Sequence, residues 1–229
     1  MPSNDHILQF HADLESVVEA EVSSVAEAVH GAWMVGGCDI SKPVVNFLWY
    51  RNLHLREAYM ASGGDTSTFE SFRDAMHGMS RGGHTIDDAI DGDDPWNDIL
   101  CGESGKILFY ATSPRIVEYM RPVLCAMADD FVLLTPCDVG YADRLPDSAT
   151  VVRFVLSAKD IFHNELIAKC LPVVWRFANT IARYIAALKP RVLVCMDGCQ
   201  TEYELAALYC RQLGIPSVCI QPQSTPLAA

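Results

Sequence analysis

Hydrophobic residues in the first part of the chain recur every three or four positions, the spacing that one buried face of a helix produces. The pattern predicts an amphipathic helix over residues 5–30, whose opposite face is acidic. Two further helices are predicted over residues 43–61 and 67–79. No strand pattern precedes residue 105, so this part should be mainly helical. Its long first helix is expected to pack on its own domain or, alternatively, to pair two copies of the chain.

The pattern changes at Lys106, after which short apolar runs alternate with helical segments. Strands are predicted over residues 106–112, 131–136, 150–156, 191–197 and 216–222. Helices are predicted over residues 114–128, about 160–188 and 201–213, and Pro172 is expected to kink or split the second. This alternation predicts an α/β fold with a parallel sheet of about five strands and helices on both faces.

Charge divides the chain at the same place. Residues 1–104 hold 18 Asp and Glu against 5 Lys and Arg, whereas residues 105–229 hold 11 against 12. We therefore predict an acidic helical region over 1–104 and an α/β domain over 105–229. The total net charge of −12 argues against a protein that binds duplex nucleic acid, because such proteins need clustered bases against phosphate.

The sequence gives no sign of export or membrane insertion. The first 41 residues contain no Lys or Arg, so a basic leader is absent. No apolar run approaches the roughly 18–20 residues of a membrane span. The nine Cys are an odd number and many lie in apolar segments, which favours buried, reduced thiols. We expect a cytoplasmic protein without a membrane span.

The motifs predict neither a cofactor nor a metal. The chain has no GxGxxG and no GxxxxGK[ST], so a dinucleotide fingerprint and a phosphate loop are both unsupported. An Asp-rich stretch near residues 87–98 loosely resembles a calcium loop, but Ala89 stands where a ligand is required. No second pair of ligands accompanies Cys195 and Cys199 for zinc. A hydrolase built on Cys199 and His163 stays open, although their spacing does not support it.

Ligands of open α/β sheets bind beyond the carboxyl ends of the strands. After the first predicted strand, Thr112 and Ser113 can cap the helix that begins at Pro114. The start of a helix favours anions, and Arg115 adds a positive charge for a phosphate or carboxylate. The alternative is a capped helix with a surface arginine.

A second polar corner follows the fourth predicted strand. Asp197 at the strand end can accept a proton or hold sugar hydroxyls, and Gly198 permits a tight turn. Thr201 and Glu202 begin the next helix, where the helix dipole favours both Glu202 and Glu204. Asp197 is the candidate catalytic residue, with a purely structural turn as the alternative.

The closing stretch "LKPRVLVCMDG…ELAALYCRQLGIPSVCIQPQ" resembles the N-terminal Rossmann-like domain of GT-B glycosyltransferases. It is most similar to the surface-polysaccharide and teichoic-acid type and to the related UDP-N-acetylglucosamine 2-epimerases. "KILFYATSPRIVEYMRPVLCAM" also resembles their opening strand and helix. The resemblance covers residues 105–223 and implies a Rossmann-like sheet in a protein of bacterial glycan biosynthesis.

The resemblance also implies roles for individual residues. By this resemblance, the acceptor cleft would be lined by Thr112, Ser113 and Arg115. The substrate would be faced by Asp197 and Gly198. Gln221 matches the Gln of the family's frequent Gln-His-Gly, but Pro222 and Gln223 replace its His and Gly.

The family binds its donor nucleotide mainly in a second Rossmann domain, which does not follow in this sequence. The resemblance therefore implies the acceptor-binding half of a glycosyl- or phosphoglycosyl-transferase that uses a nucleotide-activated donor. A further domain or a partner would hold that donor. Two alternatives remain: a non-catalytic binding or assembly module that dimerises or docks a partner through its acidic helices, and a small stand-alone enzyme acting on a sugar or nucleotide.

Overall fold

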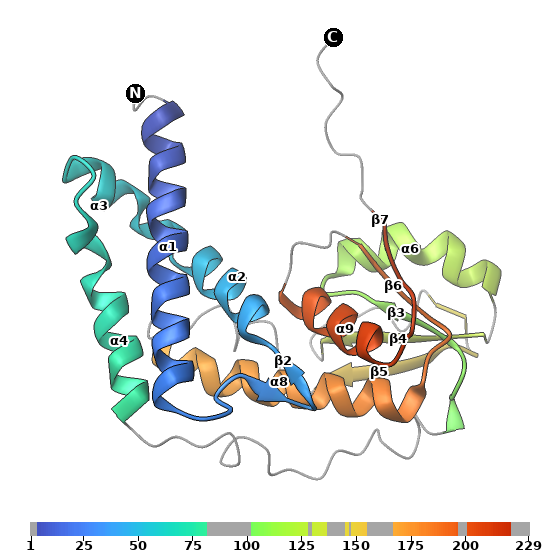
Figure 1. Cartoon of the computed structure of the whole chain (residues 1–229). Helices are drawn as coiled ribbons and strands as arrows, with labels where there is room; N and C mark the ends of the chain where they lie inside the picture. Colours follow the sequence, from blue (N-terminus) through green and yellow to red (C-terminus); the bar gives the residue numbers. More distant parts are fainter. Residues whose placement is uncertain are drawn as a thin grey trace. The chain divides into compact units, whose positions relative to one another are not determined.

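The computed structural model describes residues 4–81, 102–127, 130–136, 145–146, 148–154, 167–196 and 201–220. The chain divides into two compact units, of which the first comprises residues 1–91 with 164–176 and the second residues 92–163 with 177–229. Helix α8 (Ile167–Leu188) contributes to both units (Figure 1). The first unit thus takes in a segment from late in the chain, which the sequence did not reveal.

The first unit is mainly helical, as predicted, but the single helix predicted over residues 43–61 is wrong, because the chain breaks after Arg51 into a 3-10 turn and a second helix. Its helices are α1 (Asn4–Ala28), α2 (Ser41–Arg51), α3 (Arg56–Ala61) and α4 (Glu70–Arg81), with short 3-10 turns η1 (Leu53–Leu55) and η2 (Thr66–Phe69). Helix α1 packs against α2, α3 and α4. The predicted apolar stripe of α1 is buried there through Phe10, Leu14, Val18, Val22 and Val25. Packing of α1 on its own unit is confirmed, while dimerisation stays a prediction.

One element of the first unit was missed. Strands β1 (Met34–Val35) and β2 (Cys38–Asp39) form a small antiparallel hairpin. Its turn consists of Gly36 and Gly37, whose φ angles of 57° and 79° are left-handed and therefore suit glycine. Strands of two residues are too short to show an alternating pattern, which is why the sequence predicted no strand here.

A buried tyrosine joins α3 to α1. The hydroxyl of Tyr59 donates a hydrogen bond to the carboxylate of Asp13, and the ring stacks on Phe69 at 5.7 Å. Phe10 of α1 packs on the same ring at 5.4 Å. The hydrogen bond to Asp13, followed by burial, raises the pKa of Tyr59 to about 12. Tyr59 is therefore neutral at physiological pH and stabilises the helical packing as a donor.

The second unit is built on a five-stranded, fully parallel sheet. Its strands are β3 (Ile107–Tyr110), β4 (Phe131–Pro136), β5 (Thr150–Phe154), β6 (Val192–Met196) and β7 (Ser217–Ile220). They lie in the order β5-β4-β3-β6-β7, so the first strand of the unit is central and the order reverses beside it. Numbered within the unit, this is the order 3-2-1-4-5 of a classic Rossmann sheet without its sixth strand, and the predicted α/β class is confirmed.

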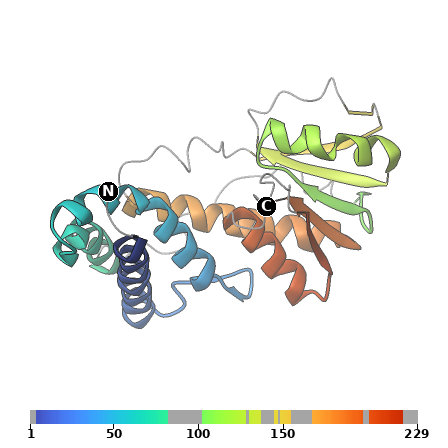
Figure 2. The ribbon, with the colours of Figure 1, turned by 90° about the horizontal axis from the view of Figure 1, so that it is seen from above.

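Helices cover both faces of this sheet. Helix α6 (Pro114–Met127) lies on one face, and α9 (Thr201–Gln212) with residues 177–188 of α8 lies on the other (Figure 2). On the α6 face, Phe109, Phe131 and Leu133 pack against Val117 and Leu124. The sequence predicted that Pro172 would kink or split this helix; α8 runs through Pro172 as one element, so it is not split there, and the kink stays a prediction.

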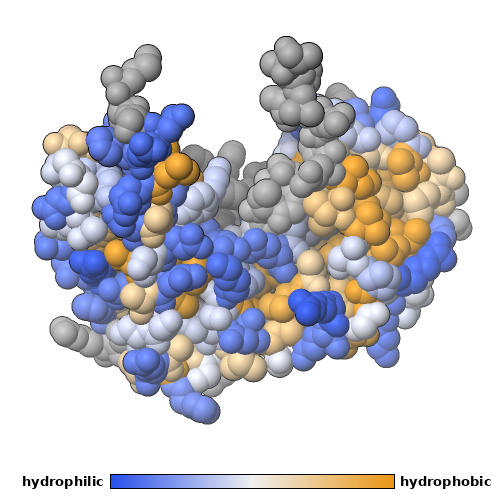
Figure 3. All heavy atoms as spheres, turned by 45° about the horizontal axis from the view of Figure 1, so that its top comes forward, coloured by the Kyte–Doolittle hydropathy of each residue, from blue (hydrophilic) through white to orange (hydrophobic). Residues whose placement is uncertain are grey.

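The outer strand of the second unit is uncovered. All four residues of β7 are exposed, including Val218 and Ile220, and α6 exposes Tyr119 and Val123. In the space-filling view, apolar atoms gather on the second unit (Figure 3). Across the part of the chain that the structure describes, no helix has the length and apolar character needed to cross a bilayer.

The change Tyr59→Phe removes the hydroxyl that donates to Asp13 but keeps the ring. We expect the free energy of unfolding to fall by about 1 kcal/mol at pH 7, the usual net contribution of a hydrogen bond. Because the pKa of Tyr59 is raised from 10.0 to about 12 on folding, this contribution is complete below pH 10 and is lost as the pH rises to 12. Urea unfolding at several pH values measures the difference between variant and parent.

The matched control is Tyr50→Phe, since Tyr50 belongs to the same unit but is 62% exposed. It should change the free energy of unfolding by less than about 0.5 kcal/mol. Equal effects of the two substitutions at pH 7 would show that the hydrogen bond to Asp13 does not stabilise the unit.

Candidate functional site

Strands β3 and β6 form the topological switch point of the sheet. From β3 the chain proceeds to β4 and β5 on one side, whereas β6 is followed by β7 on the other side. The two strands pair in parallel, with Tyr110 opposite Cys195, so their carboxyl ends lie at one edge. Ligands of open α/β sheets bind at this place. We call Tyr110, Thr112, Ser113, Thr201, Glu202 and Tyr203 the β3/β6 corner.

Hydrogen bonds join the two sides of the corner across 91 positions of sequence. The backbone N–H of Thr112, just after β3, donates to the hydroxyl of Tyr203 in α9 at 3.3 Å. The hydroxyl of Thr112 lies 3.2 Å from the same oxygen. The two predicted corners are therefore one site, with Thr112 on one side and the start of α9 on the other.

Two buried tyrosines of the corner pack against each other. The rings of Tyr110 and Tyr203 meet edge to face, with centroids 5.0 Å apart and planes at 85°. Burial raises the pKa of Tyr203 to about 12, and burial together with Glu202 holds the pKa of Tyr110 well above its usual value. Both phenols are thus neutral at physiological pH. They can donate or accept hydrogen bonds but do not act as anionic bases.

Glu202 is a buried carboxyl at the first turn of α9. Its residue is 7% exposed, and desolvation raises its pKa above the ordinary value of 4.5. The neighbouring charge of Glu204 raises it further, while a bond from the backbone N–H of Glu202 lowers it. The helix dipole explains an acidic residue at this turn, but it does not explain burial. A buried carboxyl with a raised pKa, at the edge of the sheet where ligands bind, is a candidate for a functional group.

Helix α6 starts where the sequence predicted, while the anion contact predicted for Arg115 stays a prediction. Helix α6 begins at Pro114, and the carbonyl of Ser113 accepts from the N–H groups of Ile116 and Val117. Arg115 donates to the hydroxyl of Tyr119 from Nε at 3.2 Å and from Nη2 at 3.1 Å. Its guanidinium also lies 5.5 Å from the centre of that ring. Arg115 is thus bound along its own helix in this structure.

A buried hydroxyl lies at the same edge of the sheet, near the end of β4. Thr135 is fully buried, and within the described part of the chain its Oγ1 has no hydrogen-bond partner. Buried polar groups of folded proteins are nearly always paired, so an unpaired one needs an explanation. A ligand bearing hydroxyls at this edge would supply the missing partner.

Several predicted residues lie outside the described residues. They are the candidate base Asp197 and the binding residues Gly198 and Gln221, together with Cys199, His163 and the Asp-rich stretch. Their roles stay predictions. Among the residues that are described, no group of three or more His, Cys, Asp or Glu is placed to hold a metal ion.

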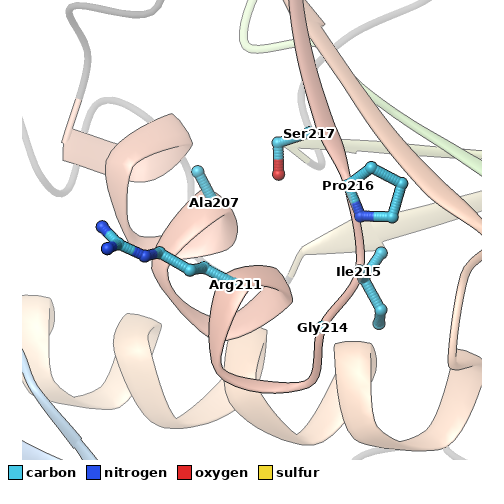
Figure 4. Close-up of a pocket in the computed structure, with 6 residues that line it drawn as sticks. All are labelled: Ala207, Arg211, Gly214, Ile215, Pro216 and Ser217. Atoms are coloured by element: carbon cyan, nitrogen blue, oxygen red, sulfur yellow. The ribbon is translucent and has the colours of Figure 1, made fainter.

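An open pocket of about 440 Å³ lies away from this corner. Its walls come from the end of α9 and the start of β7: Ala207, Arg211, Gly214, Ile215, Pro216 and Ser217 (Figure 4). It therefore lies at the amino end of β7, whereas ligands of such sheets bind at the carboxyl ends. Its lining is mainly apolar apart from Arg211 and Ser217, and we do not assign the site to it.

Sequence reasoning missed the two tyrosines. Tyr110 was counted only as part of an apolar strand and Tyr203 only as part of an amphipathic helix. A usable signal was present, because a buried tyrosine hydroxyl normally needs a partner. Tyr110 is the last residue of its strand and Tyr203 the third of its helix, so both lie where the site was expected.

Comparison of the chain with protein-family models, with curated proteins and with solved structures finds no match. The functional argument therefore rests on the geometry of the β3/β6 corner.

The change Glu202→Gln tests the buried carboxyl. A group whose pKa is raised by folding stabilises the fold below its unfolded pKa of 4.5 and loses that contribution as the pH rises through the folded value. Gln stays neutral at every pH, so the variant avoids the burial of a charged carboxylate and should be more stable than the parent at pH 7. The gain in the free energy of unfolding should exceed the roughly 0.5 kcal/mol that a surface substitution produces. The difference should shrink towards pH 4. Chemical denaturation at both pH values measures it.

The control is Glu204→Gln, because Glu204 shares the first turn of α9 but is only partly buried. It should give a smaller change at pH 7. If Glu202→Gln destabilised the protein equally at pH 7 and pH 4, desolvation of this carboxyl would not be the dominant effect.

Proposed function

We propose that the second unit binds the acceptor of a glycosyl or phosphoglycosyl transfer at the β3/β6 corner. The observation that carries this proposal is the buried network of Thr112, Tyr203, Tyr110 and Glu202 at the switch point of a Rossmann-ordered sheet. The cluster also lies where ligands of this architecture bind.

The chemistry of the corner favours a hydroxyl-rich ligand. Two phenols, a threonine hydroxyl and a carboxyl of raised pKa offer both donors and acceptors, which is what sugar hydroxyls require. The cation nearest in sequence, Arg115, is held by Tyr119. A polyphosphate would need clustered positive charge or a phosphate loop. We therefore assign the corner to the acceptor, with the nucleotide-activated donor held by a further domain or a partner.

Proton transfer from the acceptor hydroxyl is the catalytic step that this unit would provide. Asp197 remains the candidate base because it directly follows β6, whose carboxyl end belongs to the corner. Glu202, five positions further on, is a second carboxyl, whose pKa is raised by burial. In this proposal Asp197 accepts the proton, and Glu202 orients the acceptor through its hydroxyls.

The change Tyr203→Phe should weaken acceptor binding about two- to tenfold, because it removes a hydroxyl that holds Thr112 in place or bonds to the ligand, and one hydrogen bond contributes about 0.5–1.5 kcal/mol. Binding of a panel of monosaccharides and glycan fragments to the full chain, followed by NMR or calorimetry, measures this. Tyr209→Phe is the matched control, since Tyr209 is equally buried in α9 but lies outside the corner. Binding that Tyr209→Phe weakens as much as Tyr203→Phe would place the ligand elsewhere.

The change Asp197→Asn should lower transfer at least about a hundredfold, the usual contribution of a general base. Transfer is measured by mass spectrometry of the product. The assay contains nucleotide-sugar donors and an extract of the source cell, which supplies a partner that holds the donor. Circular dichroism should show an unchanged fold, and acceptor binding should persist. Unchanged turnover would remove Asp197 from the mechanism, and binding without any transfer would favour the non-catalytic binding module.

A further inference from the structure

Two cysteines lie side by side on β7, which is an edge strand of the second unit, and on its neighbour β6. Cys195 of β6 is the register partner of Cys219 of β7. Neighbouring strands lie about 4.7–4.9 Å apart. Disulfides join residues whose Cα atoms are roughly 4.4–6.8 Å apart, so this pairing meets the backbone requirement for a bond.

The two thiols are already in contact. The side chains of Cys195 and Cys219 are hydrogen-bonded, and Sγ of Cys195 also donates to the carbonyl of Val218 at 3.7 Å. Cys195 is 4% exposed, whereas Cys219 is exposed on the uncovered strand β7. The pair thus combines an exposed thiol, which an oxidant can reach, with a buried thiol on the neighbouring strand.

We propose that Cys195 and Cys219 form a reversible disulfide when the protein meets a peroxide or a small-molecule disulfide such as oxidised glutathione. The bond ties the exposed edge strand β7 covalently to β6. The proposal does not rest on the proposed transferase function, because it uses none of the residues that define the β3/β6 corner.

The chemistry balances with either oxidant. With glutathione disulfide, the Cys219 thiolate attacks one sulfur, and one reduced glutathione leaves. Cys195 then attacks the Cys219 sulfur of the mixed disulfide and expels the second glutathione, so the protein loses two hydrogen atoms and two glutathiones are released. With hydrogen peroxide, Cys219 becomes a sulfenic acid as the O–O bond breaks and water leaves. Attack by Cys195 then releases a second water.

The second step should be slow and strongly dependent on pH. Burial, followed by the neighbouring Cys219, raises the pKa of Cys195 to about 12, so its thiolate is scarce at neutral pH. The thiolate fraction rises about tenfold for each pH unit below that pKa. We therefore expect the mixed disulfide on Cys219 to accumulate first and to convert to the internal disulfide about tenfold faster at pH 8 than at pH 7.

A third cysteine provides a matched control. Cys210 of α9 is buried, and this burial, followed by the nearby Cys195, raises its pKa to about 12 as well. It lies on a helix, however, and has no register partner. Cys210→Ser should therefore leave the disulfide unchanged, whereas Cys219→Ser should abolish it and Cys195→Ser should trap glutathione on Cys219.

The test treats the reduced full chain with oxidised glutathione and analyses tryptic peptides without reduction. Cleavage after Arg191 and Arg211 places Cys219 on residues 212–229 and the other three cysteines of this region on residues 192–211. The expected result is a linked pair of these peptides, lighter than their sum by two hydrogen atoms. Because Cys195, Cys199 and Cys210 share one peptide, single Ser variants identify the partner of Cys219.

Three outcomes would overturn the proposal: a link that survives in Cys195→Ser, a link that Cys210→Ser or Cys199→Ser abolishes, or a glutathione adduct on Cys219 that never resolves at pH 8. Circular dichroism checks that each variant folds. Cys195→Ala serves as a second variant should Cys195→Ser disturb the buried strand.

Discussion

The pairing of β3 with β6 in the centre of the sheet is the interaction on which the second unit depends. Leu108 and Leu193, opposite one another in register, are almost completely buried because helices cover both faces. Backbone groups buried in this way have no water to bind and must bond to the neighbouring strands. The same pairing brings Thr112 and Tyr203 to one edge. The geometry of the corner is therefore set by the pairing of two strands that are buried at the centre of the sheet.

The corner carries a group that disfavours folding. The carboxyl of Glu202 is buried and its pKa is raised by desolvation, so its charged form destabilises the native state at neutral pH. Helix α9 does not need it, because Glu204 supplies an acidic residue in the same turn. A residue that opposes stability is expected at the carboxyl edge of such a sheet when function requires it. This contrast between Glu202 and Glu204 supports a functional corner more strongly than sequence position alone.

The strands could be predicted from the sequence because a buried parallel strand is a continuous apolar run bounded by polar residues. "FVLLTP" was predicted as residues 131–136, which are the bounds of β4. The order of the strands could not be predicted, since it is set by pairing between distant segments that no local pattern encodes. The bond between Thr112 and Tyr203 was hidden for the same reason. Local patterns located both ends of that bond, but only the sheet order brings them together.

Helix α8 limits how the two units can be separated by experiment. Its residues 167–176 belong to the first unit and its residues 177–188 to the second. In the first unit, Trp175 of α8 packs on Trp33 with ring centroids 5.7 Å apart, and the indole N–H of Trp33 donates to the carbonyl of Val22 at 2.9 Å. Removal of residues 1–104 would uncover Trp175 and create an apolar surface that the intact chain does not have. Such a truncation would change association for reasons unrelated to function, so single substitutions in the full chain separate the roles of the units more cleanly.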